Sequence, residues 1–106
     1  MRIYDGDRRS DLARATLGQD AVRLAGVDLV LTGVTKRTRA KYADRAERYV
    51  ALEAGHVAQN ILLEATVLGL AAVPIGAFDD AAVRLVVGAS NEELPLYVLP
   101  IGSPPP

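Results

Sequence analysis

The sequence predicts an α+β fold, and three segments carry that prediction. An almost continuous apolar run, from about Arg45 to Leu68, is typical of one long central helix that is covered on most of its sides. Two β-rich segments, 27–34 and 96–102, have the composition of strands. Because two strands alone make a marginal sheet, we expect at least these two strands and further sheet partners from elsewhere.

The first part of the chain predicts two short helices ahead of the first strand. Ser10 is the expected N-cap of a helix that stops at Gly18. A second helical piece is expected at 19–24. The strand that follows is mostly apolar, which is typical of a central strand covered on both faces.

The second part predicts the long helix, a tight turn, another helix and a closing strand. Gly69 has the position of a left-handed residue that ends the long helix. Val73 to Ile75 is a short extended segment, and the next helix has Asp79 and Asp80 as its N-cap and first turn. Gly55 is unfavourable inside a helix, so we expect another backbone to approach closely there.

Length and composition limit what the chain can be. With 106 residues it is one domain or part of one. We assign 1–103 to that domain and the three prolines at 104–106 to an extended tail. A net charge of −1 gives no general attraction to nucleic acid or to an anionic membrane, so neither is an expected partner.

Several classes of site are excluded by residue type. The chain has no cysteine, which excludes disulfides and thiolate metal sites, and its single histidine, His56, excludes a histidine-rich one. No metal site is therefore expected. Neither a signal peptide nor a membrane-spanning segment can be recognised, so a cytoplasmic protein is expected.

Eight short motifs follow one another through the second half of the chain. They are Lys41-Tyr42, Arg48-Tyr49, Glu53 to His56, Gln59-Asn60, Leu68 to Leu70, Pro74 to Gly76, Phe78 to Asp80, and Pro100 to Gly102. Nitroreductase-like flavoproteins of the SagB-type dehydrogenase subgroup typically show these pieces in this order. The chain therefore resembles that family, and the resemblance covers the C-terminal half of the family's domain.

The resemblance implies an FMN site at the turn formed by Pro74, Ile75, Gly76 and Ala77. The family sets backbone here against the flavin ring, where an amide can donate to the flavin N5 and small side chains permit close stacking. Glycine also permits unusual backbone angles. The same residues would equally make a plain turn between a strand and a helix, and this alternative stays open.

Lys41 and Tyr42 are the candidate catalytic residues. The matching pair in SagB-type azoline oxidases is thought to help catalysis, and a lysine or tyrosine with an altered pKa can take the proton released as hydride leaves a substrate. The alternative is that both side chains lie on a solvated helix face, as most charged runs do.

The resemblance implies an FMN-dependent oxidoreductase that passes hydride through flavin N5. Its substrate would be a small molecule, such as a nitro compound or quinone, or a peptide azoline. The family's arginine-rich loop for the FMN phosphate belongs to the N-terminal half. Arg8-Arg9-Ser10 resembles such a loop but stands in the wrong order.

Three explanations for the missing half stay open. The chain is half of a split enzyme with a separate N-terminal-half polypeptide, or a shortened form of a longer protein. Alternatively, it is a non-catalytic dimerisation or binding module that has lost FMN. The family dimerises through long helices, and the apolar run is more than a short monomer can cover, so a homodimer is expected.

Overall fold

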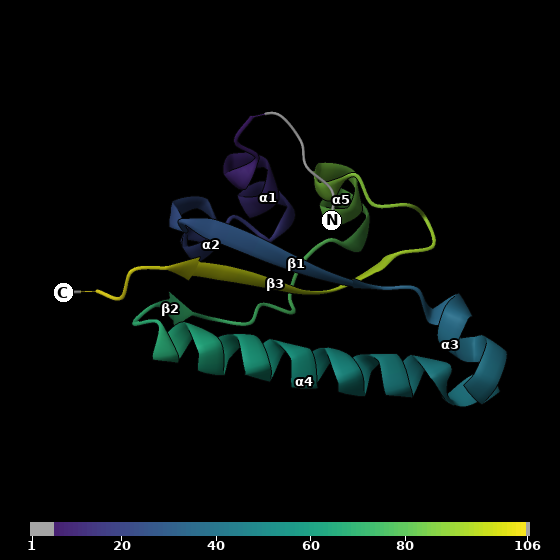
Figure 1. Ribbon diagram of the computed structural model, residues 1–106. Helices are drawn as coiled ribbons and strands as arrows, with labels where there is room; N and C mark the ends of the chain where they lie inside the picture. Colours follow the sequence, from purple (N-terminus) through teal and green to yellow (C-terminus); the bar gives the residue numbers. More distant parts are fainter. Residues whose placement is uncertain (1–5, 106) are drawn as a thin grey trace.

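The computed structural model describes residues 6–105 and confirms the α+β prediction. One antiparallel sheet is covered by three short helices on one face and by a single long helix on the other (Figure 1). In chain order the elements are α1 (Arg9–Ala15), α2 (Asp20–Leu24), β1 (Val27–Gly33), α3 (Thr35–Tyr42), the 3-10 turn η1 (Ala43–Arg45), α4 (Ala46–Val67), β2 (Ala71–Ala72), α5 (Asp80–Val87) and β3 (Leu94–Gly102).

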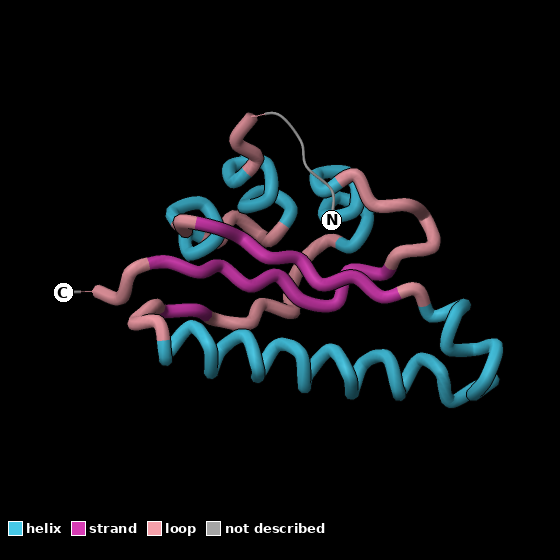
Figure 2. Tube along the Cα trace, viewed as in Figure 1, coloured by secondary structure: helices cyan, strands magenta, loops and turns pink. Residues whose placement is uncertain are grey.

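The sheet has the order β1-β3-β2, so β3 is its central strand (Figure 2). Both neighbours are antiparallel to β3. The pairing with β1 runs from Val27 opposite Ile101 to Gly33 opposite Leu94, with an irregularity after Leu31. The prediction that the first strand is central is therefore wrong within the described residues. An apolar composition did not distinguish an edge strand from a central one, because the strand order depends on long-range pairing.

The long helix matches its prediction closely. α4 spans 22 residues and ends just before Gly69, which has a φ of +73° and whose N–H donates to the Thr66 carbonyl. The residues that α4 buries are alanines, which let the helix lie close to the sheet. Its other side is open in this chain, where Leu63 and Val67 are 56% and 79% exposed. The expected cover on most sides is therefore not provided by residues 6–105.

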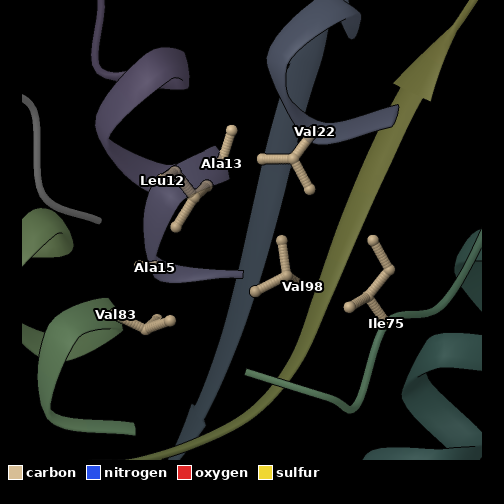
Figure 3. Close-up of a cluster of buried hydrophobic side chains, with 7 residues drawn as sticks. All are labelled: Leu12, Ala13, Ala15, Val22, Ile75, Val83 and Val98. Carbon is tan, nitrogen blue, oxygen red and sulfur yellow. The ribbon is translucent and has the colours of Figure 1, made fainter. Parts of the chain in front are cut away.

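The main core lies between the sheet and the helices α1, α2 and α5. Figure 3 shows its members converging from these helices, from β3 and from the segment after β2. They are Leu12, Ala13, Ala15, Val22, Ile75, Val83 and Val98. This core fixes both the segment before α5 and the start of α5, which are the elements that bracket the candidate flavin turn.

Helix ends follow the predictions at one place and depart from them at another. The Asp79 carboxylate accepts a hydrogen bond of 2.9 Å from the Ala82 N–H and caps α5 as expected. α1 instead begins at Arg9, so Ser10 lies inside the helix and is not its N-cap. A serine early in a helical run is thus not enough to locate the helix start, because the Asp7 carboxylate accepts the Arg9 N–H ahead of it.

The closest approach to a glycine occurs at Gly33 and not at Gly55. A Cβ built on Gly33 would lie 2.8 Å from Val50 Cγ1 and 2.9 Å from Leu96 Cδ1, whereas a Cβ on Gly55 would meet no atom within 4 Å. The prediction of a close backbone at Gly55 is therefore wrong within the described chain. Gly33 is needed where α4 crosses the end of β1.

We expect Gly33→Ala to lower the free energy of unfolding by about 1–3 kcal/mol, because the new methyl group overpacks this crossing. Gly26→Ala is the matched control, since its Cβ would lie 3.5 Å from the Ile101 carbonyl oxygen, an ordinary contact. That variant should change the free energy by less than about 1 kcal/mol. Urea unfolding measures both, and equal losses would contradict the crowding at Gly33.

Candidate functional site

The turn at 74–77 is anchored at both ends by backbone hydrogen bonds. Ile75 is buried and exchanges hydrogen bonds of 2.8 and 3.0 Å with Val98 in the central strand. On the other side, the Asp79 N–H donates to the Ala15 carbonyl at 3.0 Å and the Ala77 carbonyl accepts from Gln19 at 3.4 Å. The scaffold therefore holds the turn in one place.

The middle of the turn is open. Pro74, Gly76 and Ala77 are exposed, and the Gly76 and Ala77 N–H groups donate to no group within residues 6–105. Gly76 does not have a left-handed φ, so the turn does not use the freedom of glycine to adopt one. A Cβ on Gly76 would lie 4.0 Å from Tyr97 Cε1, so internal packing does not demand glycine either.

The candidate catalytic residues lie in a cluster where α3 meets α4, which we call the corner cluster: Lys41, Tyr42, Arg45 and Tyr49. The rings of Tyr42 and Tyr49 meet edge to face, with centroids 5.0 Å apart and planes at 83°. Lys41 Nζ lies 5.3 Å from the centroid of the Tyr42 ring. Arg45 Nε donates a 3.0 Å hydrogen bond to the Tyr49 hydroxyl.

Arg45 was not singled out by the sequence reasoning, although a signal was present. Arg45 and Tyr49 are four residues apart, the spacing at which side chains meet on one helix face. Tyr42 is 43% exposed, so the neighbouring rings leave part of it open to solvent. The prediction that Lys41 and Tyr42 act in catalysis stays a prediction.

The corner between α3 and η1 contains a strained residue. Ala43 has a φ of 51° and a ψ of −124°, a region that favours glycine, and its N–H donates to the Arg39 carbonyl. Such conformations persist only where the surrounding structure holds them, and they cluster at functional sites. Ala43 directly follows the candidate catalytic Tyr42.

The turn and the corner cluster are not brought together within this chain. Figure 1 shows α3 beyond the sheet at the start of α4, while the turn leads from β2 toward α5 and pairs with the middle of β3. A hollow of about 250 Å³ lies between β1, α3 and α4, and it is lined by Thr38 and Val50 among others. A site that uses both groups would need a surface from another chain or segment.

A third polar site was missed altogether. Asp28 on β1 lies in a hollow of about 510 Å³ between α1, β1 and α5, and neither of its buried carboxylate oxygens has a hydrogen-bond partner in the described chain. Arg9 nearby is engaged with the Asp7 carboxylate at 2.6 Å and with the Ala25 carbonyl at 2.6 Å. Burial raises the pKa of Asp28 to about 6, against the opposing charge of Arg9.

Asp28 should make the protein less stable as the pH rises from about 4 to above 6. The folded state keeps the proton, with a pKa of about 6, over a range in which the unfolded state, with a value of 3.8, has lost it. At pH 7 we expect Asp28→Asn to raise the free energy of unfolding by about 1–2 kcal/mol, a figure reduced for solvent screening. At pH 4 the gain should largely disappear.

Urea unfolding at pH 4, 5, 6 and 7 measures this dependence. The matched control is Asp44→Asn, because Asp44 is exposed on η1. A difference between wild type and Asp28→Asn that does not change with pH would show that the Asp28 carboxylate is not held in a desolvated site.

Arg8 and Arg9 belong to the segment that resembles the family's loop for the FMN phosphate, so their contacts matter. Both line the hollow beside Asp28, and Arg8 donates to the Val86 carbonyl at 3.3 Å. They are therefore part of the packing of α1 against β1 and α5. Within residues 6–105, no group of three acidic or histidine side chains could hold a metal ion, and no helix is long and apolar enough to cross a membrane.

Comparison with known proteins identifies the family. Residues 4–103 match the model of the Nitroreductase family. This chain belongs to the nitroreductase family. Among curated proteins, it is 41% identical over 102 residues to a Methanocaldococcus jannaschii protein whose name places it among the nitroreductases; the match covers 96% of this chain and 50% of that protein.

Solved structures share the nitroreductase fold. A crystal structure of an Anabaena variabilis protein, also named for the nitroreductases, is 35% identical with a TM-score of 0.87, covering 94% of this chain and 20% of that one. The NADPH:FMN oxidoreductase from Vibrio harveyi is 27% identical with a TM-score of 0.81, covering 100% of this chain and 50% of that one. This nitroreductase-family chain thus spans about half the length of the curated relative that it matches.

Proposed function

We propose that this chain is part of an FMN-dependent oxidoreductase of the SagB-type lineage, with the flavin ring seated on the 74–77 turn. The observation that carries the proposal is the pair of exposed, unpaired N–H groups of Gly76 and Ala77 on an anchored turn. Adjacent backbone donors on a rigid turn suit an electron-rich ring. Neither packing nor φ requires glycine at 76, which is consistent with a ligand pressing on its outer side.

The turn fits the ring of FMN better than its phosphate. Asp79 and Asp80 at the start of α5 would repel a dianion. Arg8 and Arg9 line the hollow beside Asp28, and Arg8 donates to the Val86 carbonyl, in another part of the molecule. We infer that the phosphate is held by a segment outside this chain, such as a separate N-terminal-half polypeptide.

FMN, when bound, supplies a hydride acceptor and donor at its N5. In this proposal the chain's own residues do the remaining work. Gly76 and Ala77 donate hydrogen bonds to the ring, and Lys41 or Tyr42 takes up or returns the substrate proton. The substrate is a nitro compound, a quinone or a peptide azoline.

Because the corner cluster lies away from the turn, it would meet a flavin only across an interface. The exposed side of α4 carries Leu52, Leu63 and Val67, an apolar face that we propose as the contact between two copies. Sedimentation velocity at micromolar concentration should then show a dimer. A single monomeric species would remove this interface from the proposal.

The alternative function is a non-catalytic dimerisation or binding module. The observation that favours it is that Pro74, Gly76 and Ala77 are all exposed, so residues 6–105 do not enclose a ligand at the turn. The discriminating experiment adds FMN to the purified protein and records the flavin spectrum after gel filtration, then adds NADPH under anaerobic conditions. A protein that retains flavin and bleaches it on reduction supports the oxidoreductase. A folded, colourless protein after the same treatment supports the module.

A further inference from the structure

We propose that Arg45, Tyr49 and the strained Ala43 act as positioning residues for the Tyr42 phenol. The inference rests on the proposed function, in which Lys41 or Tyr42 handles the substrate proton. Two side-chain contacts in the corner cluster and the backbone conformation at Ala43 support it.

The first contact is between the two aromatic rings. The centroids of the Tyr49 and Tyr42 rings lie 5.0 Å apart and the ring planes meet at 83°. In this arrangement the positive edge of one ring meets the negative face of the other. Tyr42 is 43% exposed while Tyr49 is half-buried. Tyr49 is thus the fixed partner, and the Tyr42 ring keeps an open side for a substrate.

The second contact fixes Tyr49 itself. Arg45 Nε donates to the Tyr49 hydroxyl at 3.0 Å, and the Arg45 guanidinium carbon lies 5.5 Å from the centroid of the same ring. The two residues lie one helical turn apart, at the junction of η1 and α4. A single arginine therefore contacts both the ring and the hydroxyl of Tyr49. The Tyr49 ring, held in this way, in turn orients the Tyr42 ring.

The third feature is the backbone that carries Tyr42. Ala43 holds a φ of 51°, which an L-residue adopts at a cost that glycine does not bear. Two interactions hold this corner. The Ala43 N–H donates a hydrogen bond to the Arg39 carbonyl, and an Arg39–Glu47 ion pair of 3.0 Å joins α3 to α4. Because alanine disfavours this conformation, the hydrogen bond and the ion pair must hold the corner, and with it the Tyr42 ring against Tyr49.

If Ala43 positions Tyr42, replacing it should affect the stability and the rate in different ways. Ala43→Gly should leave the melting temperature unchanged or higher, because glycine relieves the left-handed conformation. It should also lower kcat, because the corner becomes looser and Tyr42 loses its fixed orientation. A residue with a merely structural role would lose stability and rate together.

The test uses the full protein labelled with 3-fluorotyrosine, with and without FMN. Tyr42→Phe assigns the Tyr42 fluorine signal. Tyr49→Leu removes the ring contact and should move the Tyr42 signal toward that of a free tyrosine. Tyr49→Phe keeps the ring and loses only the Arg45 hydrogen bond, so its effect should be smaller. Tyr97→Phe assigns the signal of Tyr97 on β3, which should not respond to Tyr49→Leu in the FMN-free protein.

Rates are measured on the FMN-loaded protein with NADPH and p-benzoquinone. Tyr49→Leu should lower kcat about tenfold, with KM changed less than about twofold, since misplacement of a reacting group acts on the chemical step. Ala43→Gly should lower kcat without lowering the melting temperature, and Tyr49→Phe should restore most of the rate lost in Tyr49→Leu.

The outcomes separate a failure of the proposed role of Tyr42 from a failure of the positioning inference. If Tyr42→Phe leaves kcat unchanged, the proposed proton-transfer role of Tyr42 is wrong, and the positioning role for catalysis is overturned with it. If Tyr42→Phe is slow but Tyr49→Leu and Ala43→Gly are as fast as wild type, the proposed function stands and the positioning inference alone is overturned. An unmoved Tyr42 fluorine signal in Tyr49→Leu overturns it as well, whether or not FMN is bound.

Discussion

Leu99→Ala should lower the free energy of unfolding by about 2–5 kcal/mol. Leu99 is fully buried in the central strand, opposite Leu29. Its neighbour Val98 belongs to the core under α1 and α5. Because side chains alternate along a strand, Leu99 faces the other layer, where α4 covers the sheet (Figure 1). The residues that α4 buries are alanines, and a rigid helix of small side chains cannot collapse into the space that is left.

Leu85→Ala is the matched control for this loss. Leu85 lies on α5 and is 81% exposed, so its truncation should change the free energy of unfolding by less than about 0.5 kcal/mol. Guanidinium unfolding of both variants measures the contrast. If Leu99→Ala cost no more than Leu85→Ala, the packing of α4 onto the central strand would be wrong.

Ala77→Leu should abolish or strongly weaken flavin uptake, by about tenfold or more in FMN affinity. Ala77 is exposed and its N–H is unpaired within the described chain, so a larger side chain would not disturb the core but would occupy the space where the ring is proposed to stack. The melting temperature should therefore stay close to that of the wild-type protein.

The control adds the same bulk away from the turn. Ala21→Leu changes an exposed residue of α2 and should leave FMN affinity unchanged. Affinities are obtained from the quenching of FMN fluorescence. Equal affinities for wild type and Ala77→Leu would move the flavin site away from this turn while leaving the fold assignment intact.

The features that were predictable from sequence are those with local causes. The end of the long helix at Gly69 and the cap at Asp79 each depend on residues within one helical turn, and both are confirmed. The position of the 74–77 turn also follows from neighbours in the chain. Its anchor could not be predicted, because Ile75 pairs with Val98, a residue 23 positions away.

The features that were missed depend on contacts between distant segments. β2 consists of Ala71 and Ala72, which have no strand-forming composition and become a strand only beside β3. The crowding at Gly33 arises because α4 and β3 meet there. Asp28 stands in a mostly apolar strand, and the burial of its carboxylate oxygens depends on how α1 and α5 pack over β1. A single sequence contains no direct signal for these arrangements.

The central claim is that the flavin ring lies on the Gly76 and Ala77 amides. The most direct measurement is a titration of the ¹⁵N-labelled protein with FMN, followed through the backbone amide signals. We expect the Gly76 and Ala77 signals to move most and those of α1 and α2 to stay in place, with riboflavin acting like FMN because the turn recognises the ring and not the phosphate. Binding of FMN that leaves the Gly76 and Ala77 signals unmoved would contradict the claim.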